Sequence, residues 1–142
     1  LGAVGIHFQG CPLKVILVPG DAEKWNAFAA ADAAIVKSGT VTLEVAMAGT
    51  PMVVAYRVHP ISAWMMRRMI TTKYANLINI LLKKEVIPEL LQELCTDQII
   101  ATAAAQLLQY PDLQQTQKEG AAQALRMLVP TSPPSDIAAQ TL

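Results

Sequence analysis

Residues 33–56, AAIVKSGTVTLEVAMAGTPMVVAY, decide the fold that this 142-residue sequence predicts. Residues 33–36 and 52–56 are short apolar runs of the length expected for buried strands, and residues 40–48 between them favour a helix. A Gly-Thr-Pro sequence at residues 49–51 ends that helix with the usual glycine-then-proline punctuation. Two strands joined through a helix by short connections run parallel, so this stretch predicts a βαβ unit with a right-handed crossover.

The residues before this unit extend the same pattern. Residues 15–18 (VILV) are a β-branched apolar run that Pro19 and Gly20 end, as expected for a further buried strand. Asp21 is placed to cap a helix that continues to Ala31. We therefore expect an α/β fold, a Rossmann-like parallel sheet with flanking helices.

The second half of the sequence is mostly helical in pattern. Pro60 favours the start of a helix, Pro88 indicates a short extended piece at residues 86–88, and two longer helices are expected at residues 97–109 and 111–128. We expect one domain at residues 13–128, preceded by an irregular segment at residues 1–12 and followed by a flexible, proline-containing tail at residues 129–142.

The composition excludes several classes of protein. The formal net charge is +0 at pH 7, whereas nucleic-acid-binding domains usually carry a basic excess, so no nucleic-acid partner is expected. No apolar run approaches the roughly 18 residues of a membrane-spanning helix. The two cysteines, Cys11 and Cys95, lack metal-ligand spacing, so we expect no metal or cofactor and a cytoplasmic protein.

Candidate ligand-binding residues follow the predicted strands. Ser38 follows one strand and Tyr56 and Arg57 end the next, so all three belong to the carboxyl edge of the sheet, where ligands of α/β proteins bind. Gly39 permits a close backbone approach, and Ser38 and Thr40 add hydroxyl groups at the start of a helix. A helix start attracts phosphate through its free amides and its dipole, so these residues predict an anion site.

Glu44 adds a second feature to this site. With Ser38 as the N-cap, Glu44 lies in the second turn of a helix that is apolar almost all round, where a lone carboxylate needs a partner. Thr40 lies four residues earlier on the same helix face. A ribose diol bound by Glu44, with phosphate bound by Ser38 and Thr40, is one explanation. A capped buried helix whose glutamate reaches solvent is the other.

The sequence also resembles a known family. Residues 27–56, AFAAADAAIVKSGTVTLEVAMAGTPMVVAY, are similar to the C-terminal domain of the lipid-A-disaccharide synthases, which are glycosyltransferases of GT-B architecture. The similarity extends over about residues 13–128 and includes Arg57, the helix at residues 64–68, Asn79 and the ELLQE sequence at residues 89–93. It implies that this chain is the C-terminal, nucleotide-binding half of a GT-B enzyme.

The resemblance implies a reaction and a set of roles. The family condenses UDP-2,3-diacylglucosamine with 2,3-diacylglucosamine 1-phosphate, giving the lipid A disaccharide and UDP. By this resemblance Ser38, Gly39 and Thr40 take the diphosphate and Glu44 takes the ribose. The residues expected to line the cleft are Tyr56, Arg57, Asn79, Glu89 and Gln92.

The resemblance also implies what lies elsewhere. The general base of the family belongs to an N-terminal domain, so no catalytic residue is expected in this sequence and the chain alone should be inactive. The expected partners are UDP, UDP-diacylglucosamine, a lipid acceptor at the inner membrane surface, and a second copy in a homodimer. Two positions near Asn79 depart from the family pattern: Ile78 replaces the usual Pro, and Lys83 replaces the usual Gly.

Two further functions are compatible with the sequence. One is that of another GT-B transferase, such as the sugar-nucleotide transferase of peptidoglycan synthesis. The other is that of a non-catalytic remnant that serves as a partner or regulatory domain.

Overall fold

The computed structural model describes residues 14–58 and 73–129 of the chain. The helix expected from Pro60 lies outside these residues, as do the N-terminal segment up to residue 13 and the tail from residue 130. The proposed domain limits therefore remain a prediction.

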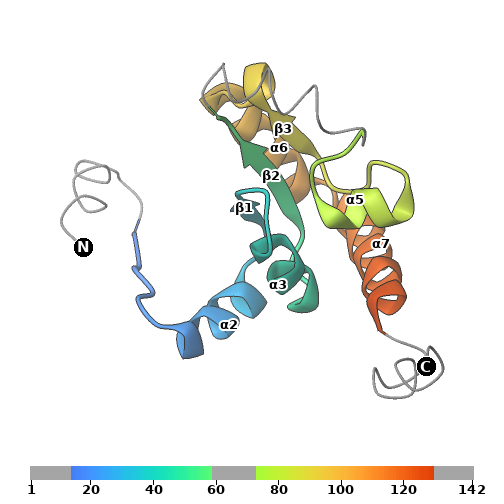
Figure 1. The fold of residues 1–142 in the computed structure, drawn as a ribbon. Helices are drawn as coiled ribbons and strands as arrows, with labels where there is room; N and C mark the ends of the chain where they lie inside the picture. Colours follow the sequence, from blue (N-terminus) through green and yellow to red (C-terminus); the bar gives the residue numbers. More distant parts are fainter. Residues whose placement is uncertain (1–13, 59–72, 130–142) are drawn as a thin grey trace.

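A parallel sheet forms the centre of the described structure (Figure 1). Its three strands lie in the order β1 (Ala34–Val36), β2 (Met52–Tyr56) and β3 (Glu89–Leu91), and both pairings are parallel. Val36 pairs with Val54, and Tyr56 pairs with Leu91. The predicted α/β fold with a parallel sheet and flanking helices is confirmed.

Helices cover both faces of this sheet. Successive residues of β2 point to opposite faces, so each face contributes side chains to a separate core. Val53 packs with Leu90 and Leu107 under α6. Met52 and Val54 belong to the larger core on the other face. The helices of the fold are α2 (Asp21–Ala30), α3 (Val41–Met47), α5 (Leu77–Leu82), α6 (Asp97–Gln109) and α7 (Pro111–Leu128), with a 3-10 turn η1 (Gln92–Leu94) after β3.

The N-terminal part of the described chain differs from the prediction. Residues 15–18 form no strand, and Ile16 is 70% exposed. An apolar run becomes a strand only when another strand pairs with it, and β1 is the edge strand of the sheet as described. Ile35 in β1 is correspondingly exposed, so β1 is not the fully buried strand that its sequence predicts. Gly20, not Asp21, is the N-cap of α2.

Strand β3 lies just after the extended piece that the sequence predicts. The expected extended piece at residues 86–88 is irregular, and β3 begins one residue later at Glu89. The main chain around Pro88 still joins the sheet, because the amide of Val54 donates to the Pro88 carbonyl at 2.9 Å. The helices predicted at residues 97–109 and 111–128 have the bounds of α6 and α7.

Helix α7 packs closely beneath this region. A Cβ added at Gly120 would lie 2.6 Å from Cγ1 of Val86, so only glycine allows the two segments to approach this closely. The buried Gln117 side chain accepts a hydrogen bond from the amide of Met52 at 2.9 Å. Because β2 begins at Met52, this bond satisfies a buried amide at the start of the central strand.

The short helix α5 contains Ile78 and ends at Lys83, the two positions where the sequence differs from what the resemblance implies. Asn76 caps its N-terminus by accepting a hydrogen bond from the amide of Asn79 at 3.1 Å. Ile78 lies in the first turn, where proline is tolerated, and its side chain is fully buried in the core. Lys83 is the C-cap and has a φ of 54°, in the left-handed region that glycine adopts without strain.

We predict that Lys83→Gly stabilises the chain. Relief of the left-handed strain should raise the free energy of unfolding by about 1 kcal/mol. Urea denaturation measures the change. Lys84→Gly is the matched control, because Lys84 is also exposed and is not among the described residues with positive φ. It should leave stability unchanged or lower it, and equal effects of the two substitutions would contradict the prediction.

Candidate functional site

The carboxyl edge of the sheet brings the predicted residues together. Because the strands are parallel, the residues that follow β1, end β2 and follow β3 lie along one edge. Ser38 follows β1, Tyr56 and Arg57 come at the end of β2, and Gln92 follows β3. The expectation that Ser38 shares an edge with Tyr56 and Arg57 is confirmed.

The turn after β1 is shaped by one glycine and one buried threonine. Gly39 has a φ of 148°, a conformation that residues with a side chain rarely adopt. The hydroxyl of the fully buried Thr42 donates to the Gly39 carbonyl at 2.7 Å and so anchors the turn from within the next helix. Sequence reasoning missed Thr42, although its place three residues after Gly39 is that of a side chain that can reach back to the turn.

The start of α3 differs from the prediction. Its N-cap is Thr40, not Ser38, and the helix begins at Val41. The amides of Thr42 and Leu43 already donate to the Gly39 and Thr40 carbonyls at 3.2 and 3.0 Å. Part of the donor set that a helix start offers to an anion is therefore used inside the turn. Glu44 consequently lies in the first turn and not in the second.

Glu44 has a partner that the sequence did not indicate. The ammonium group of Lys24 on α2 lies 3.2 Å from Oε1 and 3.1 Å from Oε2 of this carboxylate. The Glu44 side chain is 34% exposed, so it is partly open to solvent as well as paired. The hydrogen bond that Lys24 donates to Glu44 is the main cause that raises the pKa of Lys24 above its ordinary value. Lys24 therefore keeps its charge to a higher pH than a free lysine, and the stability that the raised pKa contributes is lost as the pH rises through it.

Ser38 is linked to β3 through a short loop. Its hydroxyl donates to the Ala75 carbonyl at 3.2 Å, and the Ala75 amide donates to Oε2 of Glu89 at 2.6 Å. Oε1 of Glu89 accepts from the amide and the side chain of Asn76 at 3.1 and 2.7 Å. Glu89 therefore orders the loop that lies against Ser38.

Asn79 lies beneath Glu89 and is fully buried. Its side-chain nitrogen donates to Glu89 at 2.8 Å and to the Ile87 carbonyl at 2.7 Å. Its side-chain oxygen accepts from the amides of Val86 and Ile87 at 2.9 and 3.0 Å. These four bonds use the full hydrogen-bonding capacity of the amide. In this structure Asn79 thus holds the chain around β3, and its predicted contact with a ligand stays a prediction.

The remaining predicted residues line the edge with different degrees of constraint. Tyr56 is half-buried, and the amine of Lys37 lies 5.2 Å from the centre of its ring, in cation–π range. Arg57 is exposed. Gln92 is the first residue of η1, directly after β3, and has a φ of 50°, an uncommon conformation for a residue with a side chain. The edge therefore carries the cationic side chains of Lys37 and Arg57, and its main chain has an uncommon conformation at Gln92.

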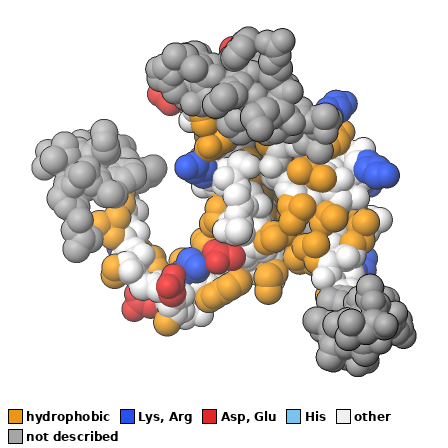
Figure 2. Space-filling view, viewed as in Figure 1, with side chains coloured by type: hydrophobic (Ala, Val, Ile, Leu, Met, Phe, Trp, Pro, Cys, Tyr) orange, Lys and Arg blue, Asp and Glu red, His pale blue; other side chains and the backbone are white. Residues whose placement is uncertain are grey.

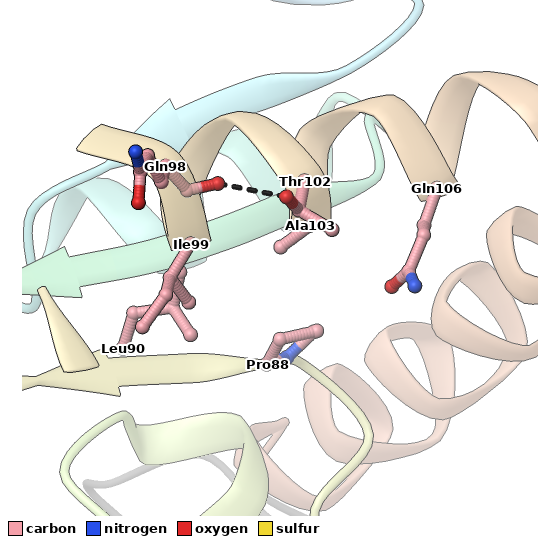
Figure 3. A pocket seen from close by; sticks show the side chains of 7 residues that line it. All are labelled: Pro88, Leu90, Gln98, Ile99, Thr102, Ala103 and Gln106. Carbon is pink, nitrogen blue, oxygen red and sulfur yellow. Dashed lines mark hydrogen bonds between the residues drawn. The ribbon is translucent and has the colours of Figure 1, made fainter. Parts of the chain in front are cut away.

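A separate groove of about 370 Å³ lies between β3 and α6 (Figure 3). Its lining consists of Pro88, Leu90, Gln98, Ile99, Thr102, Ala103 and Gln106. The Thr102 hydroxyl is already bound to the Gln98 carbonyl at 2.8 Å. None of the predicted site residues borders this groove, and its lining carries no charged side chain that would hold a phosphate.

The described residues contain neither a group of three or more side chains suited to a metal ion nor a helix long and apolar enough to cross a membrane.

The fold and the edge residues together define the class of protein. A parallel sheet covered on both faces, with a glycine turn and hydroxyl groups at its carboxyl edge, is a Rossmann-like α/β domain of the type found in GT-B glycosyltransferases. Residues 8–133 match the family model described as lipid-A-disaccharide synthetase. The chain belongs to this family.

Relatives with the name lipid-A-disaccharide synthase support the assignment. The chain is 44% identical to the one from Rhodospirillum centenum over 135 residues, which are 94% of this chain and 34% of the relative. It is 41% identical to that of Gluconobacter oxydans over 90% of this chain and 31% of the relative. It is 50% identical to that of Granulibacter bethesdensis over 68% of this chain and 25% of the relative. The chain thus spans about a third or less of the length of these relatives.

We predict that Asn79→Ala strongly destabilises the fold. The substitution leaves the partly buried amide of Val86 and the buried amide and carbonyl of Ile87 without their partner, which should lower the free energy of unfolding by about 3 kcal/mol or more. Thermal unfolding measures the loss. The control is Asn26→Ala, which removes an exposed amide from α2 and should change little. A loss no larger than that of the control would contradict the assigned role of Asn79.

Proposed function

We propose that this chain forms the UDP-binding part of a lipid-A-disaccharide synthase. The reaction joins the diacylglucosamine of UDP-2,3-diacylglucosamine to 2,3-diacylglucosamine 1-phosphate and releases UDP. The observation that carries the proposal is the turn at residues 38–40: the Ser-Gly-Thr sequence lies within the matched region and at the carboxyl edge of a parallel sheet, and Gly39 has a conformation that residues with a side chain rarely adopt.

The proposed roles follow the arrangement of the edge. Ser38, Gly39 and Thr40 contact the diphosphate, and the partly exposed carboxylate of Glu44 accepts hydrogen bonds from the ribose hydroxyls. The cationic Arg57 lies at the end of the neighbouring strand and favours a phosphate. An acidic residue that binds ribose near a glycine turn that binds phosphate is a recurrent solution in Rossmann-like domains.

The other predicted cleft residues shape this surface. Tyr56 offers a half-buried ring at the end of β2, and Gln92 begins the turn after β3. Glu89 and Asn79 contribute from below, since their hydrogen bonds order the loop that Ser38 contacts. A nucleotide at this edge would meet a surface that is largely organised before it binds.

The remaining parts of the reaction require groups beyond this third of the family's length. Transfer of the sugar needs a base within hydrogen-bond reach of the acceptor hydroxyl. We assign that base to the part of the family outside the matched region, and so we name no catalytic residue here. By itself the chain should bind UDP weakly and form no disaccharide.

The environment of the enzyme is also part of the proposal. Figure 2 shows hydrophobic side chains gathered over α3, α5 and α7, and Met47, Leu77 and Met127 on these helices are exposed. Exposed apolar surface of this kind favours association. We propose that the surface supports a homodimer and that the enzyme acts at the inner membrane surface, where its lipid substrates lie. Light scattering after size-exclusion chromatography tests the dimer, which a monomeric mass would contradict.

Two measurements on this chain test the function directly. Isothermal titration should detect UDP binding and much weaker binding of ADP, and an assay with both lipid substrates should detect no disaccharide. Equal affinity for the two nucleotides, or absence of UDP binding, would count against the nucleotide site. Disaccharide formation by the chain alone would overturn the assignment of the base. A non-catalytic remnant, the alternative from the sequence, predicts no selective UDP binding.

Gly39 provides the sharpest single substitution. We predict that Gly39→Ala lowers UDP affinity about tenfold. An alanine in this backbone conformation would be strained by about 1–3 kcal/mol, and the turn would move away from its binding geometry to relieve the strain. Gly49 is a matched control: it also has a positive φ, 75°, and neither glycine has an atom within 4 Å of an added Cβ. Gly49 lies at the other end of α3, so Gly49→Ala should lower stability and leave UDP affinity unchanged. Similar losses of affinity in both variants would contradict the assignment of the turn.

A further inference from the structure

The contact between Lys24 and Glu44 joins two helices across the candidate site. Lys24 belongs to α2 and Glu44 to α3, twenty positions apart in the sequence. The ammonium group is almost equidistant from the two carboxylate oxygens, at 3.2 and 3.1 Å. The exposed fraction of the side chain is 30% for Lys24 and 34% for Glu44, so each remains accessible to solvent within the ion pair.

This geometry fixes the carboxylate without saturating it. An ionised carboxylate offers about four lone-pair positions. An ammonium group between the two oxygens restricts rotation of the carboxylate and leaves lone pairs on each oxygen. A free glutamate side chain would lose conformational entropy when it bound a ligand, which would weaken binding. In this structure the ion pair has already ordered the group.

The rest of α2 supports this arrangement. The helix buries no residue of its own, but Phe28 packs against the core and its carbonyl accepts from the Thr50 hydroxyl at 2.5 Å. These contacts hold the C-terminal part of α2 beside α3. The charged groups that face the Lys24 ammonium are Glu44 and, at 3.4 Å, the exposed Asp21.

We propose that Lys24 is a positioning residue, which holds the Glu44 carboxylate in the orientation that accepts hydrogen bonds from the ribose hydroxyls of a uridine nucleotide. This inference depends on the proposed role of Glu44 in nucleotide binding. Lys24 itself need not touch the nucleotide. Lys24 should therefore affect the affinity for ligands that carry the ribose hydroxyl groups, and should affect the binding of the phosphate or the base much less.

The test compares UDP with 2′-deoxy-UDP, which lacks one hydroxyl of the ribose diol. In the unmodified chain UDP should bind about tenfold more tightly, since a hydrogen bond to a charged group contributes about 1.5 kcal/mol or more. Lys24→Met should lower UDP affinity by about the same factor and reduce the ratio of the two affinities towards one. Lys24→Arg retains a cation near Glu44 and should restore part of the ratio.

Two controls separate positioning from stability. Lys118→Met removes an exposed lysine from α7 and should leave both affinities unchanged. Thermal unfolding of Lys24→Met should show only a small change, because an ion pair between partly exposed side chains contributes little to stability. If Lys24→Met does not fold, Lys24→Gln, which also removes the charge beside Glu44, replaces it: a ratio reduced towards one upholds the proposal, and a ratio equal to that of the unmodified chain overturns it.

The outcomes distinguish this inference from the proposed function. If the unmodified chain binds both nucleotides equally, the ribose role of Glu44 fails, and the inference fails with it. If the unmodified chain discriminates and folded Lys24→Met discriminates equally well, the proposed function stands and the positioning role is overturned. Tighter UDP binding by Lys24→Met would show that Lys24 competes with the ligand for Glu44, which also overturns it.

Discussion

The side-chain amide of Asn79 binds the main chain at Val86 and Ile87 and the carboxylate of Glu89. A fully buried amide can be tolerated only when its donors and acceptors are satisfied, and here each of them has a partner inside the protein. This constraint fixes where β3 begins and directs the Glu89 carboxylate towards the loop before α5. The loop in turn contacts Ser38, so the order of the candidate site depends on a group that is itself remote from solvent.

The elements that sequence reasoning placed correctly are those with local determinants. Thr96 caps α6, and Pro111 occupies the first position of α7, so the start of each helix is specified by one or two neighbouring residues. Strands are different, because an extended segment is defined by its partner. Residues 15–18 have the composition of a strand, but no strand within residues 14–58 and 73–129 pairs with them. Strand β3 lies at Glu89–Leu91 because that is where the chain pairs with β2.

The candidate site divides in the same way. Topology alone placed Ser38 and Tyr56 on one edge, because parallel strands align their carboxyl ends. The partner of Glu44 could not be predicted, since Lys24 lies on another helix and no periodicity relates the two. The role of Asn79 could not be predicted either. An asparagine in the first half of a helix reads equally well as a ligand contact and as a buried structural group, and only tertiary packing separates these roles.

The left-handed conformation of Lys83 shows how the family pattern and the physical argument inform each other. The resemblance implies a glycine at this position, and the structure agrees with it physically, since the chain leaves α5 through a conformation that glycine adopts freely. Lysine there carries a local strain that the surrounding contacts must offset. The Asn79 side chain spans this turn, because its oxygen accepts from the amides of Val86 and Ile87 beyond Lys83. The side chain that orders β3 therefore also holds the two ends of the turn together.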